Sequence, residues 1–176
     1  MDADDTYDWF RGYAHFRDAL APWMARQDAI LVLGCGNSGL CADLWADGFT
    51  AGALVNVDYS EAVIARMRAR MPPERFPGVA WHVLDFRALH VALPAAHFDV
   101  VLDKGSLDAL WSDGGSPWAP SPAVVADVTA TLDGVMHVLR PGGRFICISF
   151  GQPHFRLPLL ERPGAWVLAG SKAQQL

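Results

Sequence analysis

The stretch Ala29-Ile-Leu-Val-Leu-Gly-Cys-Gly-Asn-Ser-Gly39 joins a run of apolar side chains to a turn rich in glycine. A continuous apolar run that ends in glycines is typical of a strand buried on both faces. After the turn, Leu40, Cys41 and Leu44 recur at helical spacing, and Gly48 stands where such a helix would end. A strand, a glycine turn and a helix in this order predict the first unit of a parallel sheet covered by helices.

Further apolar runs downstream extend this sheet. They predict strands over residues 53–57, 79–84, 98–102 and 144–149. Between the strands, Ser60 and Ser121 are placed to cap the N-termini of helices, and Pro72 and Pro141 are placed to stop them. We therefore predict an α/β fold with a mostly parallel central sheet and helices on both faces.

The chain of 176 residues is long enough for one domain with its own core. Residues 1–28 carry a series of aromatic side chains, and we expect them to form a helical segment that packs on the sheet and covers a ligand pocket as a lid. Residues 29–176 are expected to form the domain that carries the sheet. Residues 112–122, which are rich in Gly, Pro and Ser, are expected to form a surface loop.

Composition argues against several function classes. The formal net charge of -5 gives no overall attraction to phosphate backbones, so we expect no nucleic-acid partner. The longest uncharged run, residues 29–42, is too short and too polar to span a bilayer, so we expect no membrane association. The acidic start Met1-Asp-Ala-Asp-Asp5 does not resemble a secretory signal, and Cys35, Cys41 and Cys147 lack disulfide or metal spacing. We therefore expect a cytoplasmic protein with reduced cysteines and no metal site.

Glycines and carboxylates follow the predicted strands at the points where the strands end. Gly34 and Gly36 lie in the turn after the first strand, where a ligand can approach the backbone and the free N–H groups of a helix start. Asp58 ends the second strand, where a carboxylate can accept hydrogen bonds from both hydroxyls of a ribose. Asp85 and Asp103 end the third and fourth strands. Because ligands bind at this edge in open α/β sheets, the set predicts a nucleoside cofactor.

Two classes of nucleoside cofactor use such an edge, the nicotinamide dinucleotides and S-adenosylmethionine. A short-chain dehydrogenase needs a Tyr-x-x-x-Lys pattern, and none of Tyr7, Tyr13 and Tyr59 has a lysine at that spacing. The glycine turn also lacks the G-x-x-x-x-G-K-[ST] pattern that binds nucleotide triphosphates. The residues therefore favour S-adenosylmethionine over hydride transfer or ATP hydrolysis.

Several sequence blocks carry a family resemblance. They are Ile30-Leu-Val-Leu-Gly-Cys-Gly-Asn-Ser38, Val57-Asp-Tyr-Ser60, Phe98-Asp-Val-Val-Leu-Asp-Lys-Gly-Ser-Leu-Asp-Ala-Leu110 and Leu139-Arg-Pro-Gly-Gly-Arg-Phe145. Together they resemble a class I S-adenosylmethionine-dependent methyltransferase, which implies a Rossmann-like fold. The D-K-G-S-L-D-A block, with Tyr7-Asp-Trp-Phe10 and Gln152-Pro-His-Phe-Arg156, is similar to the methyltransferase-like group that includes lysine methyltransferases of translation elongation factor 1A.

The resemblance implies cofactor-binding roles for individual residues. Gly34 and Gly36 match the glycine loop that lies against the methionine and ribose parts of S-adenosyl-L-methionine. Asp58 matches the acid that holds the ribose hydroxyls, and Tyr59 matches a residue beside the adenine.

The remaining matched positions come from the third and fourth strands and from the N-terminal segment. Asp85 and Phe86 match the pair that frames the adenine, where the carboxylate accepts from the exocyclic amine. Lys104 matches a position near the cofactor at the end of the fourth strand, and Trp9 matches an aromatic residue that closes over the cofactor.

The resemblance further implies methyl transfer to a protein lysine, with elongation factor 1A as the expected partner. We expect Trp9, Phe10, Tyr13 and Trp111 to line a channel that disfavours the charged form of the lysine amine. Asp103 is expected to orient that amine, and no catalytic base is identified. Two other functions stay open at this point: a methyltransferase-fold module that binds without turnover, and a methyltransferase of small molecules.

The C-terminal end is expected to carry an incomplete strand pair. The family fold adds a sixth strand and an antiparallel seventh strand after the one predicted at residues 144–149. Residues 164–170 are predicted to supply one of those strands, and residues 171–176 to form a tail. An incomplete pair would leave one edge of the strand at residues 144–149 open, which invites self-association.

Overall fold

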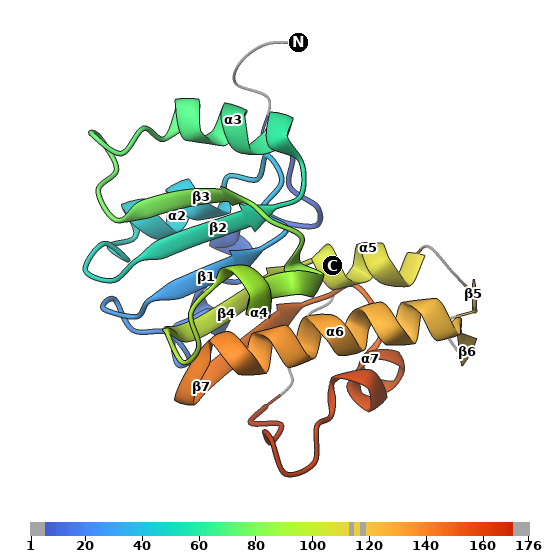
Figure 1. Ribbon diagram of the computed structural model, residues 1–176. Helices are drawn as coiled ribbons and strands as arrows, with labels where there is room; N and C mark the ends of the chain where they lie inside the picture. Colours follow the sequence, from blue (N-terminus) through green and yellow to red (C-terminus); the bar gives the residue numbers. More distant parts are fainter. Residues whose placement is uncertain (1–5, 113–114, 117–118, 171–176) are drawn as a thin grey trace.

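The computed structural model describes residues 6–112, 115–116 and 119–170. Its centre is a parallel sheet with the strand order β3-β2-β1-β4-β7 (Figure 1). The strands are β1 (Ile30–Leu33), β2 (Leu54–Asp58), β3 (Val79–Val83), β4 (Phe98–Lys104) and β7 (Leu139–Ile148). Each strand lies on a run that the sequence predicts as a strand, so the α/β fold is confirmed. Only β7 starts much earlier than predicted, because Leu139 pairs with Phe98 ahead of a register shift.

Helices cover both faces of the sheet. On one face lie α2 (Leu40–Ala46) and α3 (Glu61–Arg70), and on the other lie α4 (Leu89–Ala92) and α6 (Pro122–Val138), as Figure 1 shows. The side chains of β1 alternate between the two layers: Ile30 and Val32 enter one hydrophobic cluster, and Leu31 and Leu33 enter the other. Each of these buried aliphatic side chains contributes about 1.5–3 kcal/mol through burial, so β1 holds the two layers together.

The helix starts follow the caps that the sequence predicts. The Ser60 hydroxyl accepts from the backbone N–H of Val63 at the start of α3, and the Ser121 hydroxyl accepts from that of Val124 at the start of α6. These bonds satisfy N–H groups that have no partner inside the helix. Between α5 (Ser106–Ser112) and α6, where a surface loop was expected, the described residues form a short antiparallel ribbon of β5 (Gly115–Ser116) and β6 (Ala119–Pro120).

The N-terminal segment packs on the sheet, but the helix predicted for it is much shorter than expected. It contains a 3-10 turn, η1 (Tyr13–His15), and a single helical turn, α1 (Arg17–Leu20). Neither start has a side-chain cap, and Pro22 lacks the N–H that would extend α1, so little stabilises a longer helix. The segment is held by packing, because Tyr13, Phe16, Leu20 and Met24 are buried in the cluster that covers β1.

The strand predicted at residues 164–170 is wrong. After α7 (Pro153–Leu160) the described chain is irregular, and Gly164 turns with a positive φ of 83°. Trp166 instead stacks on Phe145 of β7 with ring centroids 5.9 Å apart, and its indole N–H donates to the carbonyl of Leu160 over 2.8 Å. In the described part of the chain, β4 is therefore the only strand that pairs with β7.

Across the described residues, no helix has both the length and the apolar content needed to cross a membrane.

Candidate functional site

The predicted site residues gather at the carboxyl ends of the parallel strands. β1 pairs with β2 on one side and with β4 on the other, so the chain reverses its strand order at β1. A ligand crevice forms at such a reversal, outside the carboxyl ends of the strands. The structure thus brings the turn after β1, the end of β2 and the end of β4 to the same edge of the sheet.

The turn after β1 depends on two glycines for different reasons. Gly34 and Gly36 both have a φ of 52°, which disfavours residues with a side chain. A β-carbon at Gly34 would collide with Ser106, whose hydroxyl donates to the carbonyl of Leu33 over 2.8 Å. A β-carbon at Gly36 would meet nothing within 4 Å, so this side of the turn is open to a ligand.

Asp58 links the glycine turn to the end of β2. Its side chain is almost fully buried, and its Oδ2 accepts from the backbone N–H of Gly36 over 2.9 Å. Its Oδ1 accepts from the N–H of Ser60, also over 2.9 Å. Because an ionised carboxylate has about four lone-pair sites, these two bonds leave acceptor capacity for ribose hydroxyls. Tyr59, next in the chain, is 76% exposed, so its ring is available for stacking.

Asp85 and Phe86 follow β3, at the third strand end. Phe86 begins the 3-10 turn η2 (Phe86–Ala88), and its ring lies beside Gly34. Asp85 forms an ion pair with Arg87 over 2.6 Å, and Arg87 also reaches Asp127 of α6 over 2.9 Å. The hydrogen bonds from Arg87 hold the pKa of Asp85 below its ordinary value. An adenine amine that binds to Asp85 must therefore share this carboxylate with Arg87.

Lys104 ends β4 and connects it to the N-terminal segment. The residue is 9% exposed, and its Nζ donates to Asp8 Oδ1 over 2.9 Å and to the carbonyl of Trp9 over 3.1 Å. Asp8 also accepts a short hydrogen bond from Ser38 of the glycine turn. Burial by itself raises the pKa of Asp8, but the hydrogen bonds from Ser38 and Lys104 outweigh burial and hold the pKa below its ordinary value. One carboxylate thus fastens residues 7–10 to two strand ends.

Exposed aromatic rings surround this attachment. Trp9 is 59% exposed and contacts the Tyr7 ring edge to face. Phe10 lies directly over Gly105, which has a φ of 81°, and its ring centroid is 5.3 Å from that of Phe150. The N-terminal segment therefore presents aromatic side chains at the carboxyl end of β4.

Three other sequence-based expectations for the site are wrong. Asp103 is fully buried, and its Oδ1 accepts from the N–H groups of Ser106 and Leu107, so it caps α5 and does not face an acceptor. Burial raises the pKa of Asp103 to about 6. Tyr13 is buried and donates to Asp47 over 2.6 Å, and Trp111 is buried beneath Arg156, so neither ring belongs to the exposed aromatic group.

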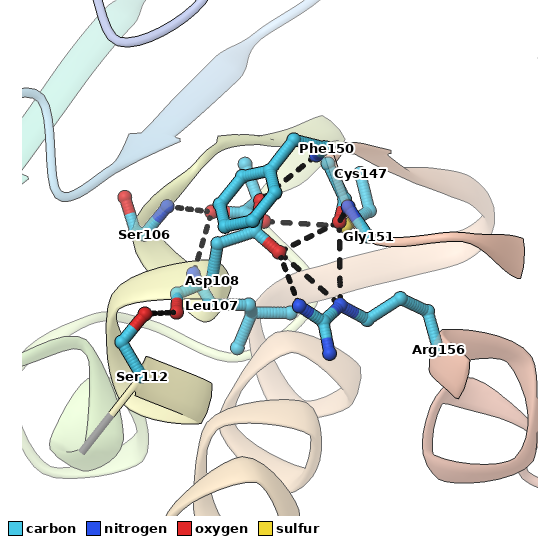
Figure 2. Close-up of polar contacts among 10 residues, drawn as sticks. Ser106, Leu107, Asp108, Ser112, Cys147, Phe150, Gly151 and Arg156 are labelled. Carbon is cyan, nitrogen blue, oxygen red and sulfur yellow. Dashed lines mark hydrogen bonds and ion pairs between the residues drawn. The ribbon is translucent and has the colours of Figure 1, made fainter. Parts of the chain in front are cut away.

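Sequence reasoning missed a buried ion pair between Asp108 and Arg156. Arg156 Nη2 lies 3.0 Å from Asp108 Oδ1, and Figure 2 shows this pair beside the turn that follows β7. Both residues stand in blocks that carry the family resemblance, D-K-G-S-L-D-A and Q-P-H-F-R, and the sequence alone predicts no role for either. The sequence offers one hint of this pair, since one block contains an acidic residue and the other a basic residue. Only the fold shows that these two residues are in contact.

The chain also matches known proteins. A family profile described as a methyltransferase domain matches residues 25–164. EEF1A lysine methyltransferase 4 from Bos taurus is 45% identical over 85% of this chain and 56% of its own length, and its Mus musculus counterpart is 43% identical over 89% and 60%. A solved S-adenosylmethionine-dependent methyltransferase from Methanosarcina mazei superposes with a TM-score of 0.59 at 19% identity, over 86% of this chain and 63% of that one.

These matches support the fold along most of the chain, since the M. mazei structure shares the architecture at low identity. The chain spans about 56–60% of the length of the two EEF1A lysine methyltransferase 4 relatives. Among the described residues, no group of three or more His, Cys, Asp or Glu side chains is arranged to hold a metal ion.

Proposed function

Because the chain belongs to the methyltransferase-domain family, we propose that it uses S-adenosyl-L-methionine to methylate a lysine of a protein, and that this protein is translation elongation factor 1A. The observation that carries the proposal is the open glycine turn at Gly36 with the Asp58 carboxylate bonded to it, at the point where the strand order reverses. The names of the two relatives at 43–45% identity support the acceptor.

The residues at the edge of the sheet fit this cofactor. Gly34 and Gly36 let the chain of the cofactor pass close to the backbone, and Asp58 keeps acceptor capacity for the ribose hydroxyls. Tyr59, Asp85 and Phe86 stand at the neighbouring strand ends, where the adenine would lie. Lys104 and Trp9 belong to the attachment of residues 7–10, and we place them at the methionine end.

When bound, the cofactor supplies an activated methyl group, so the protein has to align the acceptor and exclude water. The exposed rings of Trp9 and Phe150, with Phe10 between Gly105 and Phe150, provide an apolar wall beside the end of β4. Such a wall disfavours the ammonium form of a lysine and so favours the neutral amine that attacks a methyl group. We assign no catalytic base.

The negative net charge and the three free cysteines among the described residues fit a protein that meets a basic partner in the reducing cytosol. We therefore also propose that the protein is cytoplasmic. We propose that its partner is a protein, and not a nucleic acid or a membrane.

Two assays on the same preparation test the function. Titration with S-adenosyl-L-methionine in a calorimeter should give one binding event per chain, and a labelled methyl group should then move to elongation factor 1A. Binding without any transfer would show a module that binds without turnover. Transfer to small molecules alone would show a small-molecule methyltransferase. Either result would refute the lysine proposal.

A further inference from the structure

The turn after β7, residues 149–151, is hydrogen-bonded to the side chains of Asp108 and Arg156. Asp108 Oδ1 accepts from the Ser149 hydroxyl over 2.7 Å, and its Oδ2 accepts from the backbone N–H of Phe150 over 3.2 Å. Arg156 Nε donates to the same Oδ1 over 3.2 Å and to the Ser149 hydroxyl over 3.3 Å. Figure 2 shows Phe150, Gly151 and Arg156 around the Asp108 carboxylate.

This arrangement is buried and closely packed. The side chains of Arg156 and Asp108 are only 11% and 2% exposed, and the guanidinium lies 3.8 Å from the centre of the Trp111 ring. A β-carbon at Gly151 would collide with the Arg156 guanidinium, so a larger residue at this position would have to displace the guanidinium from where it lies. A buried guanidinium that stacks on a ring and donates hydrogen bonds through two of its nitrogens is held in one orientation. The ammonium group of a lysine cannot reproduce this planar, two-donor arrangement.

The function of this pair follows from what the turn carries on its other side. The Phe150 ring is half exposed and contacts Phe10, and Phe10 lies over Gly105 at the carboxyl end of β4. The residues proposed for the nucleoside stand at the ends of β1, β2 and β3, and Lys104 at the end of β4 is placed at the methionine end of the cofactor, so the acceptor has to approach the methyl group beside the ends of β4 and β7. The Phe10 and Phe150 rings thus lie where the acceptor must enter.

We propose that Arg156 and Asp108 are positioning residues for the acceptor: they fix the turn 149–151 and thereby place the Phe150 ring, and through it Phe10, beside the reacting groups. This inference rests on the proposed methyltransferase function. It assigns the pair no contact with the substrate, because Asp108 is buried beneath the turn. It also gives a reason why two blocks far apart in the sequence, one on α5 and one on α7, occur together in the chain.

The test is the Arg156→Lys variant, which keeps the charge and loses the paired hydrogen bonds. The matched control is Arg140→Lys, because Arg140 pairs with Asp99 over 2.9 Å at the opposite end of β7 and is 45% exposed. Two readouts are compared. Hydrogen exchange is measured at the amides of Phe150 and Gly151, which are bonded to Asp108 and to Ser149. The second readout is functional: it combines the kinetics of methyl transfer to elongation factor 1A with the calorimetric affinity for S-adenosyl-L-methionine.

We expect faster exchange at these two amides only, and a fall in kcat/KM for the protein acceptor on the order of tenfold, since small misplacements near reacting groups lower rates strongly. Cofactor affinity should stay within about twofold of the parent, because no cofactor residue is touched. The Arg140 control should change none of these. Phe150→Ala should lower kcat/KM similarly, and adding Arg156→Lys to it should cause little further loss.

Unchanged exchange at Phe150 and Gly151, or exchange that rises equally over the whole sheet, would overturn the positioning role. If the parent transfers no methyl group at all, the proposed function fails, and the exchange measurement still decides whether the pair fixes the turn. If Arg156→Lys does not fold, the Phe150→Ala variant tests the proposal through its kcat/KM for the protein acceptor. A kcat/KM equal to that of the parent would overturn the proposal.

Discussion

At the scale of single residues, Asp58 has the most direct predicted effect on the cofactor. Replacing it with alanine should weaken binding of S-adenosyl-L-methionine by about tenfold to a hundredfold, since hydrogen bonds to charged groups contribute roughly 1.5–3 kcal/mol. Calorimetry measures this, and circular dichroism checks that the fold is intact. Asp133→Ala is the control, because Asp133 is 64% exposed on α6 and, among the described residues, its side chain forms only a long ion pair with Arg162. Equal affinities in both variants would remove Asp58 from the ribose site.

Asp103 has a predicted effect on stability that depends on pH. Burial raises its pKa in the folded state to about 6, above the value of about 3.9 of an unfolded chain. A raised pKa means that the folded state binds the proton more tightly, so the stabilising contribution is complete below about pH 4 and is lost as the pH rises through about 6. Asp103→Asn keeps an oxygen that caps α5 and has no proton to lose.

Urea unfolding of the parent and of Asp103→Asn over this pH range measures the effect. The free energy of unfolding of the parent should fall, relative to that of the variant, as the pH rises from about 4 to about 6. Two parallel curves would mean that Asp103 has the same pKa in the folded and the unfolded chain.

At the scale of elements, Lys104 is expected to fasten the N-terminal segment to β4. Lys104→Met keeps the length of the side chain and leaves the Asp8 carboxylate without its cation, so residues 7–10 should detach more often. Arg11 follows this segment directly and is exposed, so trypsin cleavage after Arg11 reports the detachment. We expect faster cleavage in Lys104→Met than in the control Arg26→Met, which breaks a more exposed ion pair with Asp47. Equal cleavage in both would show that packing alone holds the segment.

At the scale of the whole molecule, the outer edge of β7 is expected to drive self-association. Along the described chain only β4 pairs with β7, and Phe145, Ile146 and Ile148 of β7 are just half buried. An unpaired strand edge with apolar side chains is a template for pairing with a second copy. Static light scattering should therefore show an average mass that rises with concentration. A monomer at all concentrations would mean that this edge is protected by other means.

The sequence predicts the sheet well at β1 and β2, because these strands are buried, largely apolar runs that end at a glycine or a carboxylate, Gly34 and Asp58. Local patterns carry less information where contacts between distant segments decide the outcome. The N-terminal helix and the strand at residues 164–170 fail for this reason, since Tyr13 and Trp166 are fixed by packing on the sheet.

The same limit applies within the site. In the sequence, Asp103 cannot be distinguished from other polar residues at strand ends. The structure shows that its carboxylate caps the N-terminus of α5. Arg156 gains a partner only when α7 folds back onto α5, which no spacing in the sequence reveals. Trp9 and Phe10 lie at the end of β4, and the closure of Trp9 over the cofactor, which the resemblance implies, stays a prediction.

The most direct test of the account is mass spectrometry of elongation factor 1A after incubation with this protein and S-adenosyl-L-methionine, with Asp58→Ala run in parallel. We predict that a peptide of the factor gains the mass of one or more methyl groups on a lysine, and that the gain is strongly reduced with Asp58→Ala. No methylated lysine with the parent protein, under conditions in which calorimetry shows the cofactor bound, would contradict the account.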